Sequence, residues 1–100
     1  MTTLHYIISK KALSDLEEIW FYTMEKWSLV QADRYYKLML EEFNYICKKP
    51  HSGKNMDHLM NGYRASKVKS HIIFYKIDNE TIQIIRILHE SMDIENRLND

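Results

Sequence analysis

The sequence predicts an α+β fold in which a helical hairpin packs on one face of a mainly antiparallel sheet. Two consecutive stretches in the first half repeat apolar residues every three or four positions, as amphipathic helices do. Three stretches in the second half are rich in β-branched and aromatic residues, with short polar links between them. Because helices and strands come in separate blocks, this order favours the α+β class over an alternating α/β arrangement.

An N-terminal strand and a first helix are predicted over residues 4–27. Residues 4–9, LHYIIS, are rich in β-formers, and Ser9 is a residue type that caps helices. The helix carries a stripe of mostly apolar residues at helical spacing: Ala12, Leu16, Ile19, Trp20, Thr23 and Trp27. Four acidic residues lie off this stripe and are expected on a solvated face: Asp15, Glu17, Glu18 and Glu25.

The segment SLVQ, residues 28–31, predicts that a second helix begins almost where the first ends. It matches a capping box, in which Ser28 and Gln31 satisfy each other's backbone N–H groups. The stripe of this helix is Ala32, Tyr36, Met39, Phe43, Ile46 and Cys47. The helix is expected to end before Pro50, because the residue preceding a proline avoids the α conformation. Two adjoining amphipathic helices make an αα-hairpin.

After a polar loop over residues 51–60, three strands are predicted, beginning at Gly62, at Ser70 and at Thr81. Asp78-Asn79 lies between the last two strands and suits a tight hairpin turn, because both residue types tolerate the left-handed conformation. The C-terminal segment SMDIENRLND predicts a short helix capped by Ser91 or Asp93. The resulting order is β-α-α-β-β-β followed by a short helix.

Length and composition indicate a single cytoplasmic domain spanning residues 1–100. Lys and Arg total 14, as do Asp and Glu, so the chain lacks the basic excess of a general nucleic-acid coat. The single cysteine, Cys47, excludes an intramolecular disulfide and is interpreted as a core residue. The sequence shows neither a signal peptide nor an apolar run long enough for a membrane span. No cofactor is predicted, and the spacing of His51, Asp57 and His58 does not favour a metal site.

Arg86 interrupts the apolar stretch IIRILHESMDI, residues 84–94, and raises the question of its role. Alternation along a strand predicts one face with Ile85, Ile87 and His89, and another with Ile82, Ile84, Arg86 and Leu88. One interpretation is an ion pair with an acidic residue of the C-terminal segment: Glu90, Asp93 or Glu95. The other is a basic site on the uncovered face, where Arg64, with Lys67 or Lys69, joins Arg86 to hold a phosphate or carboxylate.

Two histidines of the predicted strands, His71 and His89, are further candidates for a functional site. A histidine titrates near neutral pH and therefore suits general acid–base chemistry. The alternative is a structural role in which each ring is satisfied by hydrogen bonds. The residues alone leave both interpretations open.

Taken together, these residues resemble the ParE branch of the RelE/ParE toxin superfamily over nearly the whole chain. The resemblance rests on short motifs in a fixed order. They are Tyr22-Thr23, Trp27, Gln31-Ala32, Tyr36, Pro50-x-x-Gly53, Gly62-Tyr63-Arg64, His71, Phe74-Tyr75, RILH at residues 86–89 and Met92-Asp93. The fold of that family has the same β-α-α-β-β-β order.

The resemblance implies a bacterial toxin of a type II toxin–antitoxin system, with plasmid stabilisation as its role. Such a toxin inhibits DNA gyrase, blocks replication and is neutralised by a ParD-like antitoxin. It implies a binding protein that does not act as an enzyme and does not itself bind nucleic acid. Six residues are candidates for target contact: Arg64, His71, Arg86, His89, Met92 and Asp93. Five apolar residues off the helical stripes are candidates for antitoxin contact: Phe21, Tyr22, Leu29, Tyr35 and Leu38.

Two alternatives to gyrase inhibition remain at this stage. A RelE-like toxin cleaves mRNA on the ribosome, and here Arg64, Arg86 and His89 would supply its cations and its acid–base group. The neutral net charge and the lack of a basic cluster before Gly62 disfavour this reading. The other alternative is an inactive module that keeps the toxin fold for binding alone.

Overall fold

The computed structural model describes residues 3–99. In chain order its elements are β1 (His5–Ile8), α1 (Lys10–Lys26), α2 (Leu29–Lys48), β2 (Lys54–Asn55), β3 (Tyr63–Val68), β4 (His71–Asp78), β5 (Thr81–His89) and α3 (Ile94–Leu98). The domain predicted over residues 1–100 therefore extends beyond the described range at both ends.

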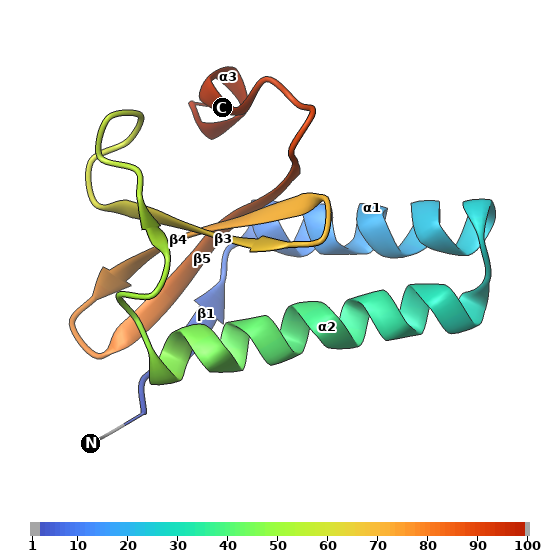
Figure 1. Ribbon diagram of the computed structural model, residues 1–100, viewed down its shortest axis with the longest axis horizontal. Coiled ribbons are helices and arrows are strands. Elements are labelled where there is room, and N and C mark those ends of the chain that lie inside the picture. Colours follow the sequence, from blue (N-terminus) through green and yellow to red (C-terminus); the bar gives the residue numbers. More distant parts are fainter. Residues whose placement is uncertain (1–2, 100) are drawn as a thin grey trace.

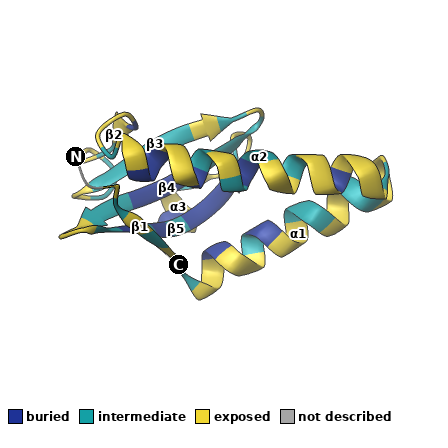
Figure 2. Cartoon of the chain, turned by 90° about the horizontal axis from the view of Figure 1, so that it is seen from below, coloured by how far each residue is buried: buried dark blue, intermediate teal, exposed yellow. Residues whose placement is uncertain are grey.

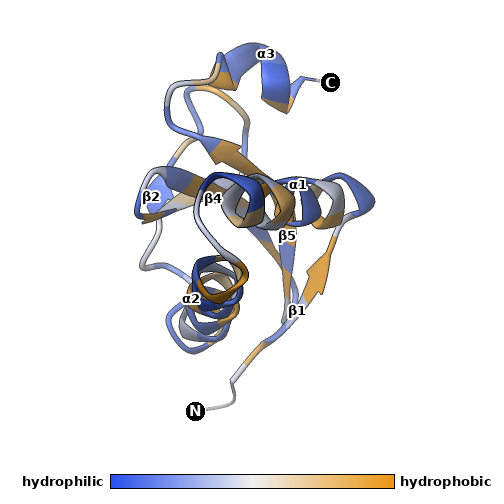
Figure 3. Cartoon of the chain, turned by 90° about the vertical axis from the view of Figure 1, so that its right-hand side faces the viewer, coloured by the Kyte–Doolittle hydropathy of each residue, from blue (hydrophilic) through white to orange (hydrophobic). Residues whose placement is uncertain are grey.

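The described strands form one sheet in the order β1-β5-β4-β3-β2. β1 pairs with β5 in parallel, and the other neighbouring strands pair antiparallel. Figures 1 and 3 show α2 on one side of the sheet and α3 on the other, with α1 running beside β5. These features confirm the predicted α+β class, its helical hairpin, its mainly antiparallel sheet and its short C-terminal helix.

The main core lies between the helical hairpin and the sheet and follows the predicted helical stripes. Leu16 of α1 packs with Met39 and Phe43 of α2 against Ile73 of β4, and all four are buried. Figure 2 shows the buried residues gathered in the central strands and on the sheet-facing sides of the helices. Cys47 is also buried in this core, as its place in the stripe predicted.

The side chains of Ser9 and Ser28 cap the two helices as predicted, but the first apolar stripe ends earlier than predicted. The Ser9 hydroxyl accepts the backbone N–H of Ala12 at 3.0 Å, and that of Ser28 accepts the N–H of Gln31 at 3.1 Å. The prediction that Trp27 continues the buried stripe is wrong, since its side chain is 77% exposed. The joint between the helices projects past the sheet (Figure 1), which accounts for this exposure.

Two short features of the sheet depend on single residues. Asn79 adopts a positive φ of 57° between β4 and β5, as predicted for this hairpin turn. Lys69 adopts a φ of 56° between β3 and β4, and its residue type does not predict this left-handed conformation.

The two-residue strand β2 lies inside the loop that the sequence predicts to be polar and irregular. Two residues are too few to show a strand period, so the sequence does not predict this strand.

A β-bulge in β5 corrects the predicted faces of that strand. Phe74 of β4 pairs with Arg86, whereas the next residue, Tyr75, pairs with Ile84, so Ile85 has no partner in β4. A bulge of this kind shifts the alternation by one residue. Ile84 and Ile87 therefore both reach the main core, contrary to the strict alternation predicted from the sequence.

The opposite face of the sheet carries a much smaller core under α3. Phe74 of β4 and Leu88 of β5 are buried there against Leu98 of α3. Arg86 lies on this face opposite Phe74. The sheet face predicted to be uncovered is thus partly covered by α3. Arg86 lies close to this helix and donates a hydrogen bond to its Arg97 carbonyl.

Candidate functional site

Arg86 is held in a buried ion pair with Asp15 of α1. Its Nε donates to one carboxylate oxygen at 2.8 Å and its Nη2 to the other at 3.0 Å, while Nη1 donates to the carbonyl of Arg97 in α3 at 2.9 Å. The exposed fractions of the two side chains are both 11%. The ion-pair interpretation is therefore right in kind, but its predicted partners are wrong. Glu90 instead pairs with Lys67, and Asp93 caps α3.

Asp15 also closes the edge of the sheet where β1 ends. β1 pairs with β5 only as far as Ile84, beyond which the Ser9 hydroxyl donates to the carbonyl of Ile85 at 2.8 Å. The backbone N–H of Ile87 then donates to the Asp15 carboxylate at 2.9 Å. An edge strand left with unpaired backbone groups invites other chains to pair with it. Asp15 thus neutralises the charge of Arg86 and also accepts a backbone N–H of β5 that β1 does not reach.

The sequence contained a faint signal for this role of Asp15. Asp15 follows Ala12 by three residues and precedes Ile19 by four, so it lies beside the apolar stripe of α1. The prediction of a solvated face is wrong for Asp15, although it holds for Glu17 and Glu18, which are exposed.

Arg64 lies on the other face of the sheet from Arg86 and serves a different purpose. It pairs with Tyr75, which faces the main core, whereas Arg86 pairs with Phe74 on the α3 face. Its guanidinium donates to the carbonyl of Gly53 at 2.8 Å and fixes the loop after α2. The predicted joint anion site of the two arginines is therefore wrong, because the bulge and the register place them on opposite faces.

His71 and His89 are directly paired across β4 and β5, with ring centroids 5.1 Å apart. The Oη of Tyr35 lies 2.6 Å from Nδ1 of His71 and 3.1 Å from the carbonyl of Val68. Burial, with His89 nearby, lowers the pKa of His71 from its usual 6.5 to about 4. Burial also raises the pKa of Tyr35. At neutral pH Tyr35 and His71 therefore form an uncharged, hydrogen-bonded pair.

Hydrogen bonds from Ser91 show which nitrogen of the His89 ring is the acceptor. The backbone N–H of Ser91 donates to Nδ1 at 3.1 Å, and the Ser91 hydroxyl lies 2.7 Å from the same nitrogen. Because Nδ1 accepts a backbone donor, the ring proton resides on Nε2. His89 therefore offers a donor at Nε2, which disfavours metal ligation through that atom.

A groove, here called the histidine groove, runs between the helical hairpin and the ends of β4 and β5. It joins two hollows of about 520 and 590 Å³, which share Tyr22, His71 and His89. The first hollow is also lined by Asp15, Glu18, Ile19, Ile87, Ser91 and Met92. The second is also lined by Thr23, Trp27, Gln31, Arg34, Tyr35, Leu38, Lys69 and Ser70.

Three of the six predicted target-contact residues line the histidine groove: His71, His89 and Met92. The other three lie elsewhere. Arg86 is only 9% exposed, Asp93 accepts the backbone N–H of Asn96 at the start of α3, and Arg64 anchors the loop after α2.

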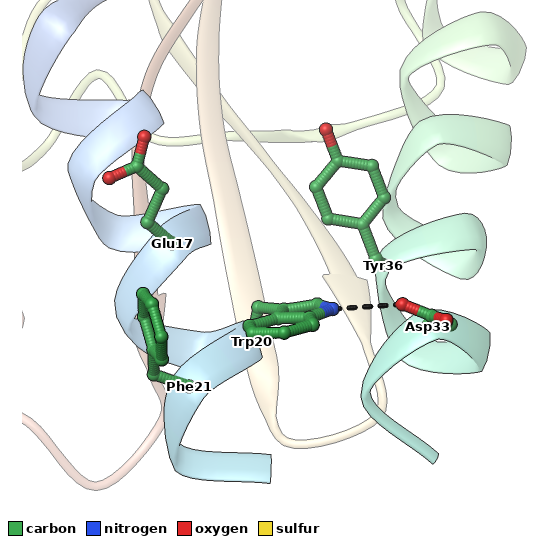
Figure 4. A pocket seen from close by; sticks show the side chains of 5 residues that line it. All are labelled: Glu17, Trp20, Phe21, Asp33 and Tyr36. Atoms are coloured by element: carbon green, nitrogen blue, oxygen red, sulfur yellow. Dashed lines mark hydrogen bonds between the residues drawn. The ribbon is translucent and has the colours of Figure 1, made fainter. Parts of the chain in front are cut away.

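The predicted antitoxin-contact residues divide between the histidine groove and the outside of the hairpin. Tyr22, Tyr35 and Leu38 line the groove, and Leu29 is exposed near the helix joint. Phe21 borders a separate hollow of about 310 Å³ between the helices, drawn in Figure 4. In that hollow Trp20 lies between the two helices, and its Nε1 donates to Asp33 at 3.0 Å.

Within residues 3–99, no group of three or more metal-ligating side chains comes together. Asp57, from the loop considered above for a metal site, instead closes that loop by accepting the N–H of Gly62 at 2.7 Å. That bond, with one from Asn55, lowers the pKa of Asp57. The described helices also include none that is both long and apolar enough to cross a bilayer.

Comparison with known proteins identifies the family. Residues 6–94 match the family described as the ParE toxin of the type II toxin–antitoxin system parDE. The chain belongs to the ParE toxin family. Residues 6–94 include the helical hairpin, all the strands from β2 to β5 and every residue that lines the histidine groove.

Curated ParE relatives match the chain along nearly its whole length. Toxin ParE1 of Mycobacterium tuberculosis is 34% identical and covers 93% of this chain and 96% of its own. Toxin ParE1 of Caulobacter vibrioides is also 34% identical, over 88% and 91% of the two chains. Toxin ParE of Escherichia coli is 29% identical, over 95% and 93%.

Two solved structures share the ParE fold of this chain at low sequence identity. The chromosomal ParDE toxin–antitoxin system of P. aeruginosa matches with a TM-score of 0.76 at 17% identity, over 87% of this chain and 96% of that one. The toxin–antitoxin complex RelBE2 of Mycobacterium tuberculosis matches with a TM-score of 0.66 at 18% identity, over 88% and 99%. The ParE and RelE branches therefore share this architecture, and fold alone does not separate them.

Proposed function

We propose that this ParE-family toxin inhibits DNA gyrase and is neutralised by a ParD-like antitoxin. The family match over residues 6–94 carries this proposal, since the ParE resemblance implies both the target and the partner. Curated relatives that bear the name ParE at 29–34% identity support the same reading.

The arrangement of the arginines favours a binding protein over a ribosome-dependent nuclease. Cleavage of mRNA needs cations that reach the phosphate and a base that reaches the 2′-hydroxyl. Arg86 is committed to Asp15, and Arg64 lies on the other face of the sheet bound to backbone carbonyls. Of the three residues that a nuclease was expected to use, His89 alone lines the histidine groove.

The histidine groove also suggests how an antitoxin neutralises the toxin. Candidates for antitoxin contact, Tyr22, Tyr35 and Leu38, line the same groove as the target-contact candidates His71 and His89. A partner seated in the groove therefore covers both sets of residues. On this proposal neutralisation is direct occlusion, and no change in the fold of the toxin is needed.

A supercoiling assay with purified toxin tests the target. Gyrase should lose supercoiling activity or accumulate cleaved DNA in the presence of the toxin. Adding the protein encoded by the neighbouring reading frame should restore activity. A toxin with Tyr22→Ala and His89→Ala serves as the groove variant, and Lys54→Ala, on β2 outside the groove, is the matched control.

Two outcomes would replace the proposal. If gyrase is unaffected while mRNA on the ribosome is cut, the chain is a RelE-like nuclease. If neither target responds while the neighbouring protein still binds, the chain is a binding module without toxin activity.

A further inference from the structure

The histidine groove is electrically divided into two halves. Among the described residues, the charged side chains that line its half next to α2 and the β3–β4 turn are the cations Arg34 and Lys69. Those that line its half next to α1 are the carboxylates Asp15 and Glu18. Because the net charge of the whole chain is zero, this division is a local feature that bulk composition does not reveal.

The two halves meet at aromatic and imidazole rings. His71 and His89 lie at the boundary with Tyr22, and at neutral pH the pKa of His71 leaves that ring uncharged. The Asp15 charge is already balanced by Arg86, so Glu18 is the exposed acid of its half. The groove thus offers cations, then a middle of aromatic and imidazole rings in which Lys26 Nζ lies 6.0 Å from the Tyr22 ring centroid, then an acid.

We propose that the histidine groove binds a segment of the antitoxin that carries an acidic residue opposite Arg34 and Lys69, an apolar residue at Tyr22, and a basic residue opposite Glu18. This inference rests on the proposed function, because it assumes that an antitoxin exists. Opposite charges at the two ends fix both the direction and the register of the bound segment, and like charges at either end exclude wrong partners.

A nucleic-acid strand fits this groove less well than a peptide. The aromatic and cationic half, with Tyr22, Trp27 and Arg34, resembles a surface on which bases stack. A strand that continues along the groove, however, brings its phosphates to Glu18 and the carboxylate of Asp15. A peptide can carry both acidic and basic side chains and can therefore complement both halves of the groove. A polyanion complements only the half that contains Arg34 and Lys69.

Charge reversal in the antitoxin complex tests the proposal. The variant R34E/K69E should weaken the antitoxin affinity by about tenfold or more, mainly through slower association because both charges are exposed, and E18K should weaken it several-fold. The loss in R34E/K69E should shrink at high salt, since exposed charges are screened. The matched control K49E/K54E makes the same change in net charge on exposed lysines at the far end of α2 and on β2, and should leave the affinity unchanged.

Three results would overturn the proposal. One is an affinity of R34E/K69E equal to that of the wild type, and another is an equal loss in K49E/K54E, which would show a general charge effect. The third is tight binding of a mixed-sequence single-stranded oligonucleotide that R34E/K69E abolishes. If the wild-type toxin does not bind the antitoxin at all, the proposed function has failed. If it binds and the variants do not matter, only the groove inference has failed.

Discussion

The two faces of the sheet are stabilised in different ways. The face under the helical hairpin buries a broad apolar cluster from α1, α2, β4 and β5. Among the described residues, the face under α3 buries Phe74, Leu88 and Leu98, with Met56 and Met60 of the loop after β2 partly buried against them, and it adds the guanidinium of Arg86. Figure 3 shows the short helix α3 on this second face. A helix of five residues buries too little surface to hold itself, so polar bonds from Arg86 supplement the packing.

This difference predicts which kind of substitution destabilises each face of the sheet. The helix-covered face should respond to lost volume, because its stability comes from close packing. The α3 face should respond to lost hydrogen bonds and charge, because Asp15 and Arg86 connect α1, β5 and α3 there. The five predictions below test this contrast from the largest expected effect to the smallest.

Phe43→Ala should be the most destabilising of the five changes. Phe43 is fully buried between α2 and the sheet, so truncation leaves a cavity and should lower the unfolding free energy by about 3–5 kcal/mol. Chemical denaturation of the purified variant measures the change. Phe21→Ala, at an aromatic side chain of α1 that is 55% exposed, is the matched control and should cost far less. Equal losses would show that the helix-covered face is not packed as described.

Asp15→Ala should come next, with a loss of about 3 kcal/mol, because it leaves the guanidinium of Arg86 buried without its carboxylate. The double variant Asp15→Leu/Arg86→Met removes both charges and should recover part of that loss. Denaturation of both variants measures the difference. A double variant that is less stable than Asp15→Ala would show that the Asp15–Arg86 pair contributes more stability than an apolar pair at these positions does.

Leu98→Ala should release α3 while the rest of the fold persists. Leu98 is 7% exposed against Phe74 and Leu88, and its loss should cost about 1–2 kcal/mol because α3 can detach locally. Hydrogen exchange should quicken in Ile94–Leu98 and remain slow in β4. Uniformly faster exchange across the sheet would contradict the local release.

Lowering the pH should destabilise the fold through His71. Its folded-state pKa of about 4 lies below its usual 6.5, so the unfolded chain binds more protons between these values. The contribution is present in full above pH 6.5 and is lost as the pH falls towards 4, amounting to about 1–2 kcal/mol after allowance for partial exposure. His71→Asn keeps a polar side chain that does not titrate, and its stability should fall less over the same window. Parallel pH profiles for the two proteins would exclude His71 as the cause.

Lys67→Ala should have the smallest effect of the five. Its ion pair with Glu90 is 3.2 Å long, but the two side chains are 60% and 44% exposed, so its loss should cost less than about 1 kcal/mol. Thermal unfolding compares this variant with Asp15→Ala. A loss as large as that of Asp15→Ala would show that exposure does not distinguish the two pairs.

Much of the fold follows from local patterns in the sequence. The stripes of α1 and α2, the caps at Ser9 and Ser28, and the turn at Asn79 are set by residues within a few positions of one another. Such signals survive in any fold, because helical spacing, capping and positive φ are local properties. The family motifs likewise located His71 and His89 before any geometry was known.

The candidate site depended on contacts that no local pattern contains. Arg86 pairs with Asp15, 71 residues earlier in the chain, whereas two of the acids that lie near Arg86 in the sequence make other contacts: Glu90 with Lys67, and Asp93 as the cap of α3. The bulge at Ile85 then placed Arg64 and Arg86 on opposite faces, because one unpaired residue reverses the alternation beyond it.

By itself the sequence determined the elements, their order and the chemical types available to a site. The tertiary structure alone decided which charges meet, since side chains from α1, α2, β4 and β5 form the histidine groove only when the hairpin packs beside the sheet. Secondary structure follows from neighbours a few residues apart, whereas ion pairs and grooves follow from packing between distant segments.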